Sequence, residues 1–179
     1  MNHANPYFHQ AIIDFSFMKP SNLIITLTFL LAVLLTGCAS YAPDDRLIGE
    51  SRAKIVQTLG KPSGELKAAD ESVLIFPRGP KGKHTYFVYV DQDGKMTRWT
   101  QVLDEKNFEL IKPDMHRDEV VAIIGEAKDT YGLARDRGYV WNYRFINAHC
   151  FWFNIEFTKE NLVRSTGYSK PPECRVKGP

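Results

Sequence analysis

Histidines and carboxylates are the side chains most often used for acid–base and metal chemistry, and this sequence holds few of them in a usable pattern. Beyond the apolar N-terminal segment the histidines are His84, His116 and His149. None of them belongs to a Ser/His/Asp arrangement or to a zinc motif. The acidic residues are scattered over expected helix starts and turns. The sequence therefore predicts a non-enzymatic protein with no catalytic residue, no metal site and no cofactor.

Composition and charge exclude other classes of protein. The chain has 179 residues, 44% hydrophobic and 25% charged, which is ordinary for one folded domain or two small ones and argues against disorder. The 23 Lys+Arg and 21 Asp+Glu leave a net charge of +2. A balance so close to neutral gives no overall electrostatic case for nucleic acid as a partner.

Cys38 follows a segment with the features of a secretory signal. The residues from Leu23 to Leu35 carry no charge, and Lys19 supplies a positive flank. As a helix this segment reaches about 20 Å, which is short for a ~30 Å hydrocarbon core and typical of a signal peptide. Leu35-Thr36-Gly37-Cys38 resembles the bacterial lipobox, and the resemblance implies cleavage before Cys38 and acylation of that residue. An ordinary signal with an incidental cysteine is the alternative. In such lipoproteins, Asp directly after the acylated cysteine is the signal for retention in the inner membrane. Ala39 occupies this position, so the resemblance implies the periplasmic face of the outer membrane.

The two remaining cysteines form an even pair. With Cys38 acylated, Cys150 and Cys174 are left in an oxidising compartment. Cys150 precedes and Cys174 follows an expected hairpin, which brings such ends together. We therefore predict a Cys150–Cys174 disulfide that stabilises the fold by about 3 kcal/mol. Two buried free thiols are the alternative. A metal site that includes His149 is less favoured, because no paired ligand spacing is present.

One stretch of the chain, residues 78–84, concentrates basic residues. The candidate contact residues are Arg78, Lys81, Lys83 and His84. The spacing does not match a phosphate-binding loop. These side chains are candidates to contact lipid headgroups, peptidoglycan or an acidic partner. Turn-forming Gly and Pro in the same stretch favour the simpler interpretation of a solvated hairpin loop.

The chain contains one internal repeat. Residues 49–60 and 114–125 align without gaps, and both segments end in glycine. The matched apolar pairs are Ile55/Val120, Val56/Val121 and Leu59/Ile124. This spacing predicts a short amphipathic helix in each segment.

Strand candidates follow each expected helix. They are residues 73–76, 85–90 and 96–102 in the first half and 140–144, 151–157 and 162–166 in the second. We expect an α+β fold of two tandem repeats, each a short helix followed by an antiparallel β-meander, with the helices on one face of the sheet. The aromatic residues Trp141, Tyr143, Phe145, Phe151, Trp152 and Phe153 are expected in the core, with a binding surface as the alternative.

A family resemblance rests on three short motifs. They are Leu59-Gly60-Lys61-Pro62, the Asp114-Met115-His116 turn and the strand Trp141-Asn142-Tyr143-Arg144. Together they resemble the BamE (SmpA/OmlA) domain of outer-membrane lipoproteins, in which Gly is usual at the position of Asp114. The tandem form is similar to the β-lactamase-inhibitor-protein-like architecture. The resemblance implies a protein partner in the envelope, with outer-membrane assembly components among the candidates.

These observations predict an order of domains and a function. We expect a signal peptide at 1–37 with Met18 as a candidate start, a lipidated tether at 38–45, BamE-like repeats at 46–108 and 109–174, and a tail at 175–179. The expected function is that of an outer-membrane-anchored periplasmic lipoprotein, a binding or scaffolding module in outer-membrane protein assembly or envelope integrity. The alternative is an inhibitor of a periplasmic enzyme.

Overall fold

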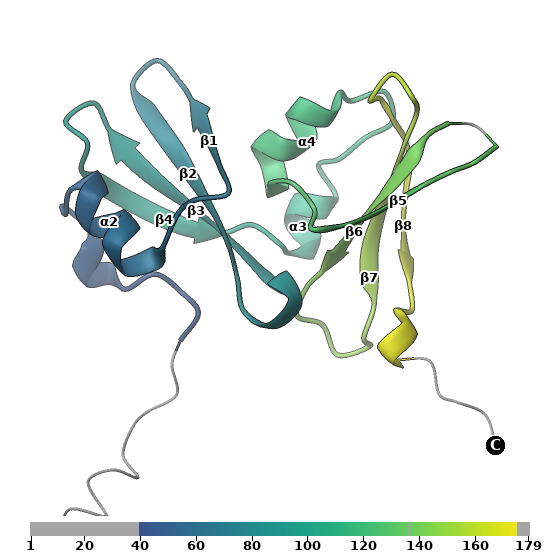
Figure 1. Ribbon diagram of the computed structural model, residues 1–179, viewed down its shortest axis with the longest axis horizontal. Coiled ribbons are helices and arrows are strands. Elements are labelled where there is room, and N and C mark those ends of the chain that lie inside the picture. The colour runs from purple at the N-terminus through teal and green to yellow at the C-terminus, as the bar shows by residue number, and fades with distance from the viewer. Residues whose placement is uncertain (1–39, 136, 175–179) are drawn as a thin grey trace, which may run out of the picture. The chain divides into compact units, whose positions relative to one another are not determined.

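Eight strands form two four-stranded antiparallel sheets within residues 40–135 and 137–174, the part of the chain that this computed structural model describes (Figure 1). The first sheet has the strand order β1-β2-β3-β4 and the second β5-β6-β7-β8. The strands are β1 (Gly64–Lys67), β2 (Glu71–Arg78), β3 (His84–Asp91), β4 (Met96–Gln101), β5 (Asp129–Gly132), β6 (Tyr139–Arg144), β7 (Trp152–Phe157) and β8 (Val163–Ser169). The helices are α2 (Arg52–Leu59), α3 (Glu105–Phe108) and α4 (Arg117–Ile124), and short 3-10 turns are η2 (Asp45–Leu47), η3 (Pro80–Gly82) and η4 (Pro172–Cys174).

The expected α+β fold of two helix-and-meander repeats is wrong, because the described chain is β-rich. Its longest helices, α2 and α4, have eight residues each, and α3 has four, which is too little to form a helical layer on one face of a sheet. Ile55 of α2 and Val120 of α4 also lie in different hydrophobic clusters. The edge strands β1 and β5 have only four residues each, a length that hydrophobic periodicity does not detect.

The central strands β2 and β3 of the first sheet are buried on both faces. Leu74 and Phe76 of β2 pack in one cluster with Ile55 of α2, whereas Val73 and Ile75 pack in the other. Because successive side chains of a strand point to opposite faces, an uninterrupted apolar run requires cover on both sides. This double burial accounts for the run of apolar residues in β2.

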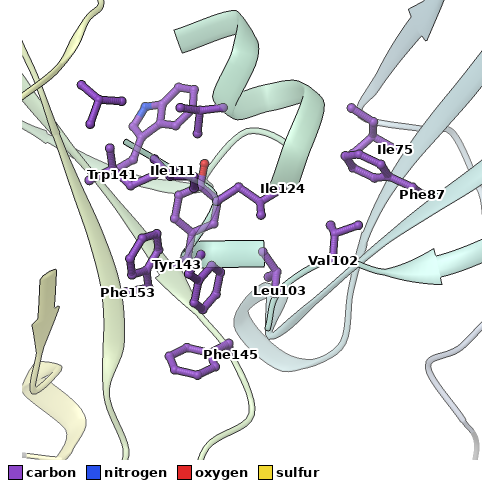
Figure 2. Packing of buried hydrophobic residues seen from close by; sticks show 14 of the residues in the cluster. Ile75, Phe87, Val102, Leu103, Ile111, Ile124, Trp141, Tyr143, Phe145 and Phe153 are labelled. Carbon is purple, nitrogen blue, oxygen red and sulfur yellow. The ribbon is translucent and has the colours of Figure 1, made fainter. Parts of the chain in front are cut away.

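The larger cluster contains residues of both sheets. Figure 2 shows Ile124 of α4 between the aromatic side chains of the second sheet and Ile75 and Phe87 of the first. Gly125 ends α4 with φ 77°, and a Cβ atom at this position would lie 3.3 Å from Ile75 Cγ2. Glycine therefore permits both the left-handed backbone and the close approach of α4 to the first sheet. The hydroxyl of Tyr143 donates a hydrogen bond of 2.8 Å to the Gly125 carbonyl from the other side.

The segment before each helix is tied to the last hairpin of its half by the same kind of backbone bond. The Gly49 amide donates to the Met96 carbonyl at 2.7 Å, and the Asp114 amide donates to the Val163 carbonyl at 2.8 Å. Both donors have positive φ, 85° at Gly49 and 68° at Asp114. The left-handed turn is therefore retained in the second half without glycine, at a cost in backbone strain.

Candidate functional site

The basic stretch forms the loop between β2 and β3. Arg78 ends β2, η3 occupies the middle of the loop, and His84 begins β3. Gly79 has φ 77°, and Lys81 also takes a left-handed backbone with φ 58°. The hairpin-loop interpretation therefore describes its backbone correctly, although its side chains make specific contacts with other elements.

Arg78 and His84 have structural partners. The Arg78 guanidinium donates a hydrogen bond of 2.8 Å to the carbonyl of Leu59, the last residue of α2, where a positive charge also suits the helix dipole. The His84 ring stacks on Tyr41 at 5.8 Å and on Tyr86 at 5.9 Å between ring centroids. Burial, with a smaller contribution from the charge of Lys83, lowers the pKa of His84 below its usual 6.5. The lowered pKa favours the neutral ring, which provides an aromatic surface for Tyr41.

A basic groove lies beside Tyr41, and we call it the tether groove. Lys61, Arg78 and Lys128 line it together with Tyr41, and its volume is about 400 Å³. None of the described residues that line it is acidic. Lys61 and Lys128 are site residues that the sequence did not indicate. Lys128 follows α4 in the other half of the chain, and only the packing of α4 on the first sheet brings it here.

Arg144, at the end of β6, is held by three partners. Its Nη1 atom lies 2.9 Å from Asp129 Oδ2, and its Nε atom lies 3.2 Å from Glu173 Oε1. Its guanidinium carbon lies 4.2 Å from the ring centroid of Trp152. Glu173 also lies 3.6 Å from the Lys81 ammonium group, so this carboxylate joins the loop of the first sheet to the second sheet. A backbone hydrogen bond, a hydrogen bond from Arg144 and the charge of Lys81 hold the pKa of Glu173 below its usual value.

The structure confirms the Cys150–Cys174 disulfide. It joins the segment before β7 to η4 after β8, and its Cα atoms lie 6.3 Å apart. Both cysteines line a second cavity of about 280 Å³, which we call the disulfide cavity. Lys81 and Lys83 contribute to its wall from the basic loop. The loop predicted from the sequence therefore borders both the tether groove and the disulfide cavity.

The remaining site predictions have separate outcomes. Cys38 and the signal peptide lie outside the described residues, so their lipidation stays a prediction. His116 caps α4, where its Nδ1 atom accepts a hydrogen bond from the Asp118 amide at 3.3 Å, and His149 is exposed near Phe151. Among the described residues no cluster of His, Cys, Asp and Glu could hold a metal ion. No helix in this part of the chain is long and apolar enough to cross a membrane.

The dense aromatic residues of the second half pack mainly in the core, as expected. Those that are buried are Trp141, Tyr143, Phe145 and Phe153. Phe151 and Trp152 are half-buried and both line the disulfide cavity. Most of this aromatic surface is therefore covered within the protein.

No family model and no curated protein matches this sequence. Solved structures with some likeness include an extracellular SCP-domain protein from Bacillus anthracis, with 10% identity and a TM-score of 0.28 over 76% of this chain and 50% of that protein. They also include a DUF4309-family protein from Bacillus subtilis, with 9% identity and a TM-score of 0.28 over 73% and 88% of the two chains. A β-lactamase-inhibitor-like protein from Streptococcus mutans has 12% identity and a TM-score of 0.31 over 84% and 98%. This chain spans half the length of the first of these proteins. These TM-scores are too low to establish a shared fold, so no function transfers from them.

Proposed function

We propose that this protein is a lipid-anchored, non-enzymatic module on the periplasmic face of the outer membrane, which binds or scaffolds an envelope protein. The observation that carries the proposal is the position of Tyr41. This residue follows Cys38 by three positions and stacks on His84 of the basic loop. Three extended residues span about 10 Å. An acylated Cys38 would therefore hold the tether groove within about 10 Å of the headgroups.

The charges of the groove suit that position. Lys61, Arg78 and Lys128 line it without an opposing carboxylate among the described residues. A basic side chain close to an anionic membrane surface contributes about 1 kcal/mol of attraction. The groove would thus orient the module on the membrane, while the acyl chains supply the anchoring. Surfaces farther from Tyr41 would remain accessible to a protein partner, with outer-membrane assembly components among the candidates.

Lipidation can be tested directly at Cys38. Cells that express the full chain are grown with labelled palmitate. They should give a labelled protein that cofractionates with the outer membrane. The Cys38→Ala variant should lose both the label and the fractionation. An unlabelled parent protein, or one that fractionates with the inner membrane, would contradict the proposed anchor.

Orientation at the membrane needs a positional probe. A photocrosslinking amino acid at Lys61 or at Lys128 should form lipid adducts in the intact envelope. Lys95 is the matched control, because it lies in the turn beyond the far end of the eight-residue strand β3, about 25 Å from the basic loop. Equal lipid adducts at Lys95 and Lys128 would refute the orientation without affecting the anchor.

A further inference from the structure

We infer that the disulfide cavity is a binding site for a small amphipathic anion, with a carboxylate head on an aromatic or aliphatic body. The cavity lies where the basic loop of the first sheet meets the disulfide-closed end of the second. At about 280 Å³ it is near the lower limit of small-molecule pockets, so it suits a fragment-sized ligand and not a whole lipid. This site is separate from the tether groove and goes beyond the proposed function.

The body of the ligand is indicated by the apolar wall. Phe145, Phe151 and Trp152 line the cavity with the disulfide, and Ile146 completes this side. The Ile146 side chain is 62% exposed, more than any other large hydrophobic residue in the described part of the chain. Apolar surface that remains in water within a concave site is surface that a ligand can cover.

The head of the ligand is indicated by the charges. Lys81, Lys83 and Arg144 line the cavity, and Glu173 is the acidic residue that faces them. Glu173 is already shared between Arg144 and Lys81. Lys83 makes no ion pair with any residue that the structure describes. The excess positive charge beside an apolar wall matches an anion that carries an apolar body.

The walls are held in place before any ligand arrives. The side chain of Asn147 holds the loop. Its Nδ2 atom donates to the backbone carbonyls of Phe145 at 3.2 Å and Phe151 at 2.9 Å, and its Oδ1 atom accepts from the backbone N–H of Phe151 at 2.9 Å. The disulfide joins this loop to η4, and the Arg144–Glu173 pair ties η4 to β6. A pre-formed site loses little entropy on binding, which favours affinity for a small ligand.

Three probes with the same body separate the contributions of head and body. The full chain, isolated from its native envelope in polymer-bounded lipid discs, is titrated with phenylbutyrate, phenylbutanol and phenylbutylamine, with empty discs as the blank. Phenylbutyrate should bind about fivefold more tightly than the neutral alcohol, because an opposite charge at about 4 Å in water contributes roughly that factor. The amine should bind more weakly than the alcohol.

Matched variants locate the site. Lys83→Gln should weaken phenylbutyrate about fivefold and leave phenylbutanol unchanged, whereas Ile146→Ala should weaken both ligands. Lys95→Gln and Ile48→Ala are the controls, because both residues are exposed and neither lines the cavity. Unchanged thermal unfolding of Lys83→Gln would show that the variant is folded.

A result that does not depend on any variant completes the test. A diazirine derivative of phenylbutyrate should label the peptide from Phe145 to Trp152. Equal binding of the acid and the alcohol, labelling at other peptides, or no saturable binding would overturn the inference. The Cys38→Ala chain, titrated in solution without discs, should still bind phenylbutyrate, so failure of the proposed anchor and failure of this site are distinguishable.

Discussion

Removing the Cys150–Cys174 disulfide should lower the free energy of unfolding by about 3 kcal/mol. The bridge joins residues 24 apart in the sequence, and closing a loop of that length removes unfolded-chain entropy equivalent to about 3.4 kcal/mol at 25 °C. The bridge also holds η4, from which Glu173 reaches Arg144. Loss of that exposed pair adds little, because water and salt screen it. For a domain of this size, a loss of about 3 kcal/mol corresponds to a fall of about 10 °C in Tm.

The assay is urea unfolding of the Cys150→Ala/Cys174→Ala double variant, followed by tryptophan fluorescence. Each single variant should lose as much stability as the double variant, because the two sulfurs form one bond. Reducing agent should shift the parent to the midpoint of the double variant and leave the double variant unchanged. His149→Ala, at an exposed neighbouring position, is the control and should unfold like the parent.

Two results would refute this reasoning. If the double variant loses less than about 1 kcal/mol, the bridge does not act through the unfolded chain as calculated. If reducing agent destabilises the parent much less than the substitutions do, the lost stability comes from packing of the side chains and not from the crosslink.

Three further predictions concern stability. Phe108→Ala should cost about 3–5 kcal/mol in urea unfolding, because the ring is buried with two other aromatic rings at centroid distances of 4.2 and 5.0 Å; a cost below 1 kcal/mol would contradict the packing. Asp114→Gly should raise the free energy of unfolding by up to about 1 kcal/mol, because glycine relieves the strain of the left-handed backbone. Asp118→Gly, inside α4, is the control and should lower the free energy of unfolding by about 1 kcal/mol. A change of the same sign in both variants would contradict backbone strain at Asp114. The hydrogen bonds from Arg52 lower the pKa of Glu65 from 4.5 to about 2, so its contribution is present above pH 4.5 and lost as the pH falls through about 2. Glu65→Gln should therefore be less stable than the parent at pH 7 by under about 1 kcal/mol, and the difference should shrink as the pH falls through about 2. A pH-independent difference would exclude this pair as the cause.

Several strands could be predicted because their residues carry local signals. The expected strands at 85–90, 140–144 and 151–157 agree with β3, β6 and β7 within one residue at each boundary. β-branched and aromatic residues alternate or run together there, and the turn residues Asp93 and Gly94 mark the hairpin that follows β3. The edge strands β1 and β5 were missed because only pairing with β2 and β6 defines them.

The fold class could not be obtained by adding such elements together. The amphipathic stripes of α2 and α4 look alike in the sequence, which suggested two equivalent helices on one face of a sheet. In the structure Ile55 packs on one face of the first sheet, whereas Ile124 packs between residues of both sheets. A stripe shows that a helix must bury one face, but it does not show which surface covers that face.

Some features of the candidate site could be predicted from the sequence, and others depend on the tertiary structure. The basic loop was visible because its residues are consecutive, and the disulfide was predictable because a hairpin separates its two cysteines. The tether groove and the disulfide cavity were not visible, because Lys128 and Glu173 join the loop from distant parts of the chain.

By itself, the sequence determined most strands, the pairing of Cys150 with Cys174 and the position of the basic loop, because these depend on neighbouring residues or on one hairpin. Only the tertiary structure decided that the chain forms two separate sheets, that β2 is buried on both faces and that the basic loop borders two cavities. The physical reason is that the burial of a side chain and the charges around it depend on contacts between residues far apart in the sequence. Local periodicity carries no information on such contacts.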